Sequence, residues 1–230
     1  MIRCPVCGHE NGDFETVCAS CKSYLQSKVD TLDLFSSIWG LIHSPRAAFR
    51  RIVLSRHKNY VVLLTALLGM AILYSVLWFR NMGRLFSNLF TVLLSGVVAG
   101  PPVGLAFAAL FTIVMVRLGH LLGGKTTFRG MYAVVAYASV PILLTLVFVF
   151  PVEVAIFGLY LFDNNPPPLV INPVLYITLL GLDGLGVLWA WLLLIEGSII
   201  ANGFSRGRSV MLALGVFLLT ACGAVAVRFL

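Results

Sequence analysis

Residues 117–141 read RLGHLLGGKTTFRGMYAVVAYASVP, and they form a polar joint between two apolar runs that contain no charged residue. The Gly123-Gly124 pair predicts the end of one helix, because glycine adopts positive φ at little steric cost. Thr126 or Thr127 is then suited to begin the next helix, since a threonine hydroxyl accepts a free backbone N–H. We therefore expect a tight turn between two helices at this joint.

The joint is also basic, which indicates the side of a membrane on which it lies. Its titratable side chains are those of Arg117, His120, Lys125 and Arg129. In membrane proteins, Lys and Arg gather in cytoplasmic loops. The joint is thus predicted to be cytoplasmic. Pro141, further along, predicts a kink in the helix that follows.

The composition of the whole chain excludes an ordinary soluble protein. Hydrophobic residues make up 60% of the chain and charged residues 11%, and the mean hydropathy is +0.98. A soluble domain carries roughly 25% charged residues, so lipid must cover much of this protein's surface. The net charge of +7 is explained by cations on the cytoplasmic side, and we expect no nucleic-acid partner.

The predicted fold is an all-α membrane protein with five transmembrane helices, because one span needs about 20 apolar residues. The expected spans are residues 59–79, 102–122, 130–152, 174–195 and 210–227. Residues 85–99 are also uncharged, but the Pro101-Pro102 pair separates them from the second span. We expect this segment to lie on the outer surface or to re-enter the membrane without crossing it.

The distribution of Lys and Arg favours five spans with a cytoplasmic N-terminus and an external C-terminus. Eight cations precede the first span, three lie at the joint and two lie between spans four and five. The external cations are then Arg80, Arg84 and Arg228. The first apolar stretch begins near Tyr60, too late for a cleavable signal peptide. We therefore expect a multi-pass protein of the cell membrane, inner or plasma.

Four of the five cysteines lie within the first 21 residues. They form two Cys-X-X-Cys pairs, Cys4 with Cys7 and Cys18 with Cys21. Each such turn presents two thiolates to one ion, and four thiolates complete the tetrahedral shell of Zn²⁺. In the reducing cytoplasm this cluster indicates a metal site in preference to disulfides or redox thiols. We expect a zinc ribbon at residues 1–25 that serves as a contact module for a protein partner.

Residues 26–58 are predicted to form a linker followed by amphipathic helices at the membrane interface. Apolar side chains recur at helical spacing at Phe35, Ile38, Trp39 and Ile42. Ser44-Pro45 predicts the start of a second helix. The cations expected to contact anionic lipid are Arg46, Arg50 and Arg51 and, from the joint, Lys125 and Arg129. Such basic helices serve either as a plain topology anchor or as specific readers of anionic lipid.

Two acidic residues of the fourth span are candidate polar site residues. An ionised carboxylate in mid-span, such as Asp183, costs about 2.5–3.5 kcal/mol on insertion scales. Asp183 is therefore either an ion, proton or polar-lipid site or a structural hydrogen-bonding group. Glu196 lies 13 residues further on, too far along the helix to form an acid pair with Asp183. The neighbours expected for Glu196 are Arg117, His120, Arg129 and Arg206, in a structural salt bridge or a phosphate-binding cluster.

Three short blocks occur in a fixed order: Trp39 with SPRAAFRR at 44–51, LGGKTTFR at 122–129 and AYASVP at 136–141. Together they resemble the Yip1 family of multi-pass membrane proteins over roughly residues 32–230. The resemblance implies five spans after a cytoplasmic N-terminus. Eukaryotic members are associated with Rab GTPases and with traffic between ER and Golgi. The zinc ribbon resembles that of prokaryotic members, so the resemblance implies neither a Rab partner nor any catalytic residue here.

These features favour a non-enzymatic function in membrane organisation or scaffolding, carried by the ribbon and by a five-helix domain over residues 59–230. The alternative is a small transporter, channel or lipid-translocating protein that uses Asp183. A membrane enzyme ranks last, because the sequence contains no nucleophile–base motif and no phosphate-cradling loop. Small residues such as Gly181, Gly184 and Gly215 permit a homo-oligomer.

Overall fold

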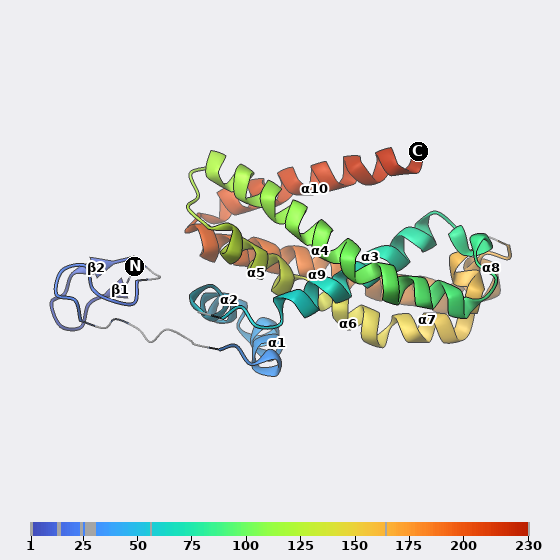
Figure 1. The fold of residues 1–230 in the computed structure, drawn as a ribbon, viewed down its shortest axis with the longest axis horizontal. Helices are drawn as coiled ribbons and strands as arrows, with labels where there is room; N and C mark the ends of the chain where they lie inside the picture. Colours follow the sequence, from blue (N-terminus) through green and yellow to red (C-terminus); the bar gives the residue numbers. More distant parts are fainter. Residues whose placement is uncertain are drawn as a thin grey trace.

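The computed structural model describes residues 2–12, 15–23, 25, 31–55, 57–163 and 165–229, with the side chains of the last helix described up to residue 218. Two short strands, β1 (Ile2–Arg3) and β2 (Glu10–Asn11), pair antiparallel near the N-terminus. The rest of the described chain is mainly helical (Figure 1). The helices are α1 (Leu34–His43), α2 (Pro45–Leu54), α3 (Val61–Phe79), η1 (Met82–Leu85), α4 (Leu89–Leu121), α5 (Phe128–Ala138), α6 (Val140–Phe148), α7 (Phe150–Phe157), η2 (Gly158–Phe162), α8 (Pro168–Ile171), α9 (Pro173–Asn202) and α10 (Arg206–Phe229).

Within the described residues, four helical stretches are long and apolar enough to cross a membrane. They are α3, α4, the stretch Phe128–Phe162 and α9. The class of an all-α membrane protein is therefore confirmed. The expected fifth span, 210–227, falls in α10, whose side chains beyond residue 218 lie outside the described residues, so five spans remain a prediction.

The joint after α4 is built as the sequence predicts. Gly123 has a φ of +85° just beyond the end of α4. Thr127 is the N-cap of α5, and its hydroxyl accepts a hydrogen bond from the backbone N–H of Gly130 over 3.3 Å. The predicted kink is also confirmed, because α5 ends at Ala138 and α6 begins at Val140 with Pro141 in its first turn.

The expectation that residues 85–99 form a separate surface-lying or re-entrant segment is wrong. Residues 89–99 are the first third of α4, one continuous helix of 33 residues that contains Pro101 and Pro102. Proline in a helix interior removes a hydrogen bond and crowds the carbonyl four residues earlier. Close packing along α3 holds the helix together at this point, as the glycines on both helices indicate.

The contact between α3 and α4 is made backbone to backbone. A Cβ added to Gly69 of α3 would overlap the Gly100 carbonyl, and one added to Gly104 of α4 would overlap the Thr65 carbonyl. Gly96 lies against the ring of Tyr74 in the same way. Glycines four residues apart thus form one face of α4, which is the pattern that lets membrane helices approach closely.

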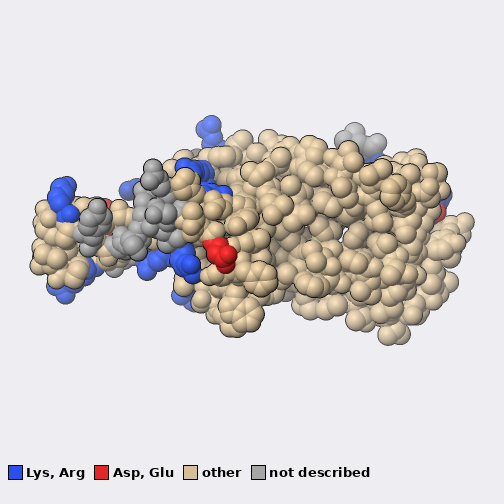
Figure 2. All heavy atoms as spheres, turned by 60° about the horizontal axis from the view of Figure 1, so that its bottom comes forward, with Lys and Arg blue, Asp and Glu red and all other residues tan. Residues whose placement is uncertain are grey.

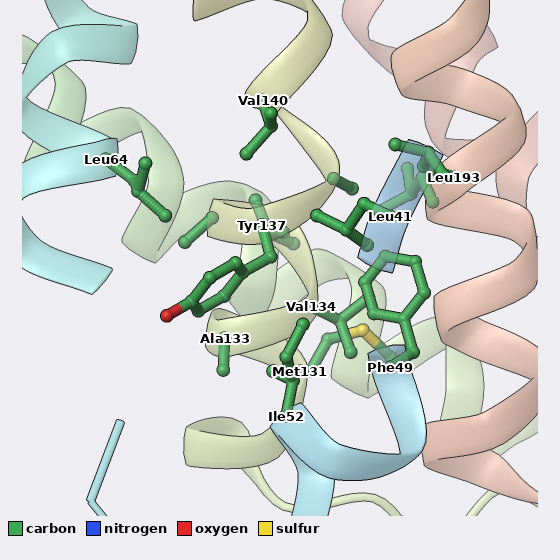
Figure 3. Close-up of a cluster of buried hydrophobic side chains, with 14 of the residues drawn as sticks. Leu41, Phe49, Ile52, Leu64, Met131, Ala133, Val134, Tyr137, Val140 and Leu193 are labelled. Carbon is green, nitrogen blue, oxygen red and sulfur yellow. The ribbon is translucent and has the colours of Figure 1, made fainter. Parts of the chain in front are cut away.

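The second predicted interfacial helix, α2, is part of the protein core. Its Phe49 and Ile52 are fully buried, and Figure 3 shows both lying against Met131 and Val134 of α5. Gly197 of α9 makes room for Phe49, because a Cβ there would lie 3.1 Å from the phenyl ring. The apolar face of α2 therefore packs on α5 and α9, and the position of this helix at the membrane interface stays a prediction.

The first predicted interfacial helix, α1, exposes Phe35, Trp39 and Ile42 of its predicted apolar stripe, while Ile38 packs against the core. Phe35 is 84% exposed and Trp39 62% exposed, while Leu41 on the opposite side is buried in the core. Asp33 caps the helix by accepting from the backbone N–H of Ser36 over 2.7 Å. The pair of helices α1 and α2 is called the collar below.

Charge is concentrated at one end of the molecule. Figure 2 shows Lys and Arg gathered at one end, while most of the remaining visible face carries no charged residue. The exposed cations of this end include Arg50 and Arg51 of α2 and Arg117, Lys125 and Arg129 of the joint. The collar and the joint therefore share the basic end of the bundle.

Candidate functional site

The four predicted cysteine ligands lie together. The Sγ atoms of Cys4, Cys7, Cys18 and Cys21 are all within 4.8 Å of one another. The Sγ–Sγ distance is 3.6 Å between Cys4 and Cys21 and also between Cys7 and Cys18. Four sulfurs at about 2.3 Å from a tetrahedral ion are roughly 3.8 Å apart. The cluster therefore fits a single four-coordinate metal ion.

Two similar backbone turns carry these cysteines. The N–H of Gly8 donates to the carbonyl of Cys4 over 2.9 Å, and the N–H of Lys22 donates to the carbonyl of Cys18 over 3.0 Å. Gly8 has a φ of +73° and Lys22 a φ of +61°. Lys22 thus adopts the left-handed conformation that glycine provides in the first turn.

Ser23 is a further part of this cluster that the sequence pattern did not reveal. Its hydroxyl oxygen lies 3.1 Å from Cys4 Sγ and 3.0 Å from Cys21 Sγ. Hydrogen bonding from Ser23 is the main cause that lowers the pKa of Cys4 to about 6. The hydroxyl thereby favours the thiolate form, which is the form that binds metal.

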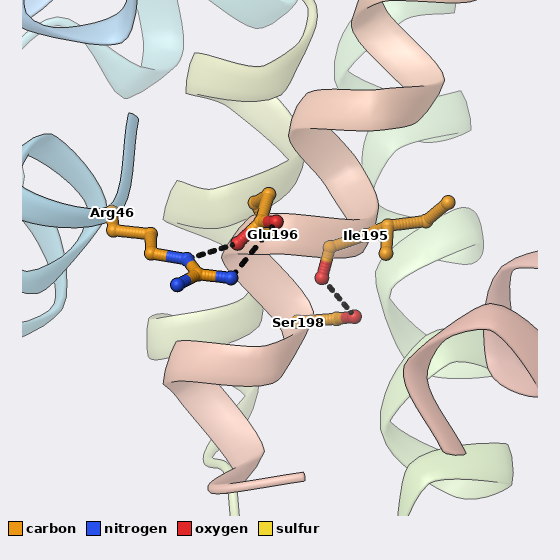
Figure 4. Close-up of polar contacts among 4 residues, drawn as sticks. All are labelled: Arg46, Ile195, Glu196 and Ser198. Atoms are coloured by element: carbon orange, nitrogen blue, oxygen red, sulfur yellow. Dashed lines mark hydrogen bonds and ion pairs between the residues drawn. The ribbon is translucent and has the colours of Figure 1, made fainter. Parts of the chain in front are cut away.

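At the basic end, Glu196 pairs with Arg46, a partner that is not among those expected from the sequence, and a contribution of Arg117, Arg129 or Arg206 stays a prediction. Arg46 Nε lies 2.9 Å from Glu196 Oε2, and Nη2 lies 3.4 Å from Oε1 (Figure 4). The Arg46 side chain is 57% exposed and that of Glu196 27%. This two-point contact ties α2 to α9 across 150 residues of sequence. Whether Arg46 also contacts lipid stays a prediction.

His120 takes part in closing the joint. Its Nε2 lies 3.1 Å from the carbonyl oxygen of Thr126, and the side chains of Arg117, Lys125 and Arg129 are exposed around it. Asp183 and Glu196 lie in different surroundings, because Glu196 meets Arg46 and Asp183 lies on a different part of α9. A polar cluster of Glu196 with Arg117 and His120 stays a prediction.

Asp183 lines a cavity of about 410 Å³ between α3, α6, α7 and α9. Its carboxyl interacts with the hydroxyl of Thr145 and with the carboxyl of Glu153. Glu153 belongs to α7 and is only 7% exposed. The described residues that line the cavity include no Lys and no Arg. Two carboxyl groups thus face each other inside the apolar part of the bundle.

Glu153 is the site residue that sequence reasoning missed. It lies just beyond the expected third span, which ends at residue 152. Phe150–Phe157 is a helix in which Pro151 occupies the first turn. The available signal was that Glu153 is the one charged residue between 130 and 162, a stretch otherwise apolar enough to span a membrane.

Comparison with known proteins identifies the helical part of the chain. A family model described as the Yip1 domain matches residues 39–227. Neither a curated protein nor a solved structure matches the chain. The matched range runs from the middle of α1 nearly to the end of α10, and so it includes part of the collar together with the bundle.

Proposed function

The chain belongs to the Yip1 domain family, and from this premise we propose that it is a non-enzymatic protein that organises the membrane around it. The observation that carries this proposal is the collar. Phe49 and the Arg46–Glu196 pair fix α2 on the bundle, and α1 presents Phe35, Trp39 and Ile42 outward. Because α2 is fixed on the bundle, α1 holds its exposed aromatic side chains in a defined orientation beside Arg side chains. This arrangement suits insertion into one leaflet of the membrane.

The orientation that we propose places the basic end in the cytoplasm. The exposed Lys and Arg of the collar and joint support this side, because cytoplasmic loops are enriched in these residues. With α10 as a fifth span, the N-terminus is cytoplasmic and the C-terminus is external, in the cell membrane. The collar then acts on the cytoplasmic leaflet, where Arg50, Arg51, Lys125 and Arg129 attract anionic lipid.

We propose Zn²⁺ as the ion of the cysteine cluster, because a set of four thiolates is typical of structural zinc. Bound zinc would supply the folding free energy that a domain of this size lacks. Val6 lies between the first two ligands and is 73% exposed. An apolar side chain held outward in this way favours contact with a protein partner, which is the role that we propose for residues 1–25.

The membrane-organising proposal is tested with vesicles of phosphatidylcholine and phosphatidylglycerol that contain the full chain. Inserting the exposed stripe into one leaflet expands that leaflet, so the protein should produce smaller or tubular vesicles under electron microscopy. The variant Phe35→Ser/Trp39→Ser should yield vesicles like those without protein. Val170→Ser/Ile171→Ser removes exposed apolar side chains of α8 and is the matched control. Equal deformation by both variants contradicts the proposal.

A second candidate function is transport, which the facing carboxyls of Glu153 and Asp183 specifically favour. Acidic residues inside a span mark ion or proton pathways in many membrane proteins. In vesicles with a pH gradient, a transporter should carry protons or a small cation faster than vesicles without protein. Asp183→Asn should abolish this flux while the protein stays folded. Flux by the wild type no faster than in vesicles without protein excludes this candidate, and flux that Asp183→Asn retains excludes the role of Asp183 in it; both results leave the membrane-organising proposal unaffected.

A further inference from the structure

We infer that the cavity between α3, α6, α7 and α9 binds an amphiphilic ammonium ion, a molecule with one cationic nitrogen and an apolar body. This inference uses the same cavity as the second candidate function and names its ligand class. The inference concerns ligand binding alone, so its test is independent of whether the protein transports the ligand or organises the membrane. Three properties of the cavity carry it: its charge, its walls and its opening.

The two acidic side chains of the cavity favour a cationic ligand. Glu153 is more than nine-tenths buried and interacts with Asp183, which in turn also meets the Thr145 hydroxyl. No cationic partner of either carboxyl occurs among the described residues that line the cavity. Two ionised carboxylates that face each other in a medium of low dielectric repel strongly. The two carboxyls therefore either share a proton or bind a cation, because each of these removes the repulsion.

The walls favour an organic cation. The Tyr74 hydroxyl donates to the carbonyl of Leu93 over 2.8 Å, and Trp78 Nε1 donates to the Tyr176 hydroxyl over 3.1 Å. These hydrogen bonds occupy the polar atoms of Tyr74 and Trp78, so the two rings offer mainly aromatic surface to the cavity. Phe150 stacks on Tyr74 with ring centroids 4.5 Å apart. Aromatic surface beside carboxylates recognises alkylammonium groups.

The size and opening favour a ligand with an apolar body. About 410 Å³ is far more than an alkali ion needs and falls in the range of small-molecule sites. Ser75 of α3 and Gly184 of α9 line the cavity and are exposed on the surfaces of two candidate spans. The Ser75 hydroxyl donates to the Ala71 carbonyl of its own helix. The opening is therefore apolar and faces lipid.

The source of the ammonium group is a free amphiphile or the headgroup of phosphatidylethanolamine. Both offer the same cationic nitrogen to Glu153 and Asp183. The phosphate of a headgroup would find no Lys or Arg among the described residues that line the cavity. The free amphiphile is consequently the better fit, and the experiment below separates the two sources.

The test uses the full chain in dodecyl maltoside and isothermal titration with dodecyltrimethylammonium. Binding should be saturable, and dodecanol, which has the same chain without charge, should bind at least about tenfold more weakly. Bound cation should also displace the shared proton, which is measured as proton release in weak buffer. The other titratable groups that line the cavity are Tyr74 and Tyr176.

Two variants and one control complete the design. Glu153→Gln/Asp183→Asn should weaken probe binding at least about tenfold and abolish proton release. Gly184→Leu keeps both carboxyls and fills the opening, since a Cβ at Gly184 meets no atom within 4 Å, and it should also block the probe. Asp163→Asn, a carboxyl that pairs with Arg84 outside the cavity, should bind like the wild type.

The outcomes are distinct. Displacement of the probe by added phosphatidylethanolamine assigns the ligand to lipid headgroups, and lack of displacement assigns it to free amphiphiles. Equal binding of dodecanol, or unchanged binding by both cavity variants, overturns the inference. Circular dichroism and gel filtration establish that each variant is folded. If the double variant does not fold, probe binding by Gly184→Leu tests the inference alone.

Discussion

Lys22 occupies a backbone conformation that suits glycine. Its φ of +61° is left-handed, and this conformation costs an L-residue roughly 1–2 kcal/mol. The turn holds Lys22 there because its N–H donates to the carbonyl of Cys18. Gly8 adopts the same conformation without this cost in the first turn.

Lys22→Gly should therefore strengthen metal binding by about fivefold, which corresponds to roughly 1 kcal/mol. Gly8→Ala should weaken it, since alanine is strained at the φ of Gly8 although no atom lies within 4 Å of the added Cβ. Competition with a chromophoric zinc chelator measures both. The account of these turns is wrong if the two variants shift the affinity in the same direction.

Lys58 closes the C-terminal end of α2. Its Nζ donates to the carbonyls of Ile52 and Val53 over 2.5 and 2.9 Å. Burial, with a smaller contribution from the charge of Arg129, lowers the pKa of Lys58 from 10.5 to about 8. The Lys58 cation is thus held in a partly buried position that disfavours its charge.

The stability of the protein should consequently rise with pH through the Lys58 window. Between about pH 8 and 10.5 the unfolded chain binds a proton on Lys58 that the folded chain has lost, so deprotonation favours folding. The thermal midpoint of the wild type should increase relative to that of Lys58→Met from pH 8 to pH 10. Parallel curves for the two proteins would argue against a depressed pKa.

Residues that act through local rules could be predicted, and residues that act through distant contacts could not. The four cysteines reveal themselves by spacing, and Thr127 by its position after a glycine pair. Ser23 reaches two sulfurs only because the second turn folds back. Glu153 meets Asp183 only because Pro151 begins a helix at that point.

At the scale of elements, the attachment of the collar combines an ion pair with a buried ring. The Arg46–Glu196 pair is largely exposed, and exposed ion pairs contribute about 0–1 kcal/mol. Phe49 is fully buried, and truncating such a ring to alanine costs about 3–5 kcal/mol. The ring therefore holds α2 on the bundle, and the ion pair sets its orientation.

Phe49→Ala should release the collar, whereas Arg46→Ala should change its stability by less than about 1 kcal/mol. Limited trypsin digestion at Arg50 and Arg51 reports the release, because a docked helix resists cleavage. Phe35→Ala, which removes an exposed ring of α1, serves as the control. Rapid cleavage of Arg46→Ala, with Phe49→Ala protected, would reverse this ranking.

The packing of α3 on α4 depends on glycine at defined positions. Gly104→Leu should destroy this contact and sharply reduce the yield of folded protein, because its side chain would occupy the position of the Thr65 carbonyl. Gly181→Leu should be tolerated, since no atom lies within 4 Å of the added Cβ. Gel filtration and thermal unfolding in detergent measure both. Similar behaviour of the two variants would contradict the assigned packing.

The glycines also explain the wrong interpretation of residues 85–99. A proline pair usually ends a helix, so Pro101-Pro102 taken alone predicts a helix end. The period of four in Gly96, Gly100 and Gly104 was the stronger signal. It indicates a face that packs along a neighbouring helix, and such packing keeps the chain helical through the prolines.

At the scale of the whole molecule, the two ends of the bundle differ. The basic end carries the joint and the collar, and the opposite end carries a second core around Tyr74, Phe157 and Phe162. The fold class follows from composition alone, because a chain with so few charges needs lipid around it. The pairing of α2 with α9 does not follow from composition, because Arg46 and Glu196 are 150 residues apart in sequence.

We propose that the collar lies in the leaflet at the basic end, with α1 facing lipid and α2 facing protein. The depth of a spin label in a metal-loaded chain that carries Cys222→Ala tests this arrangement directly. A label at Phe35→Cys should collide with oxygen and lie about 5–10 Å below the headgroups. A label at Arg50→Cys should be reached by a water-soluble nickel complex. A label at Phe35→Cys that nickel reaches equally well would show that the collar lies outside the membrane.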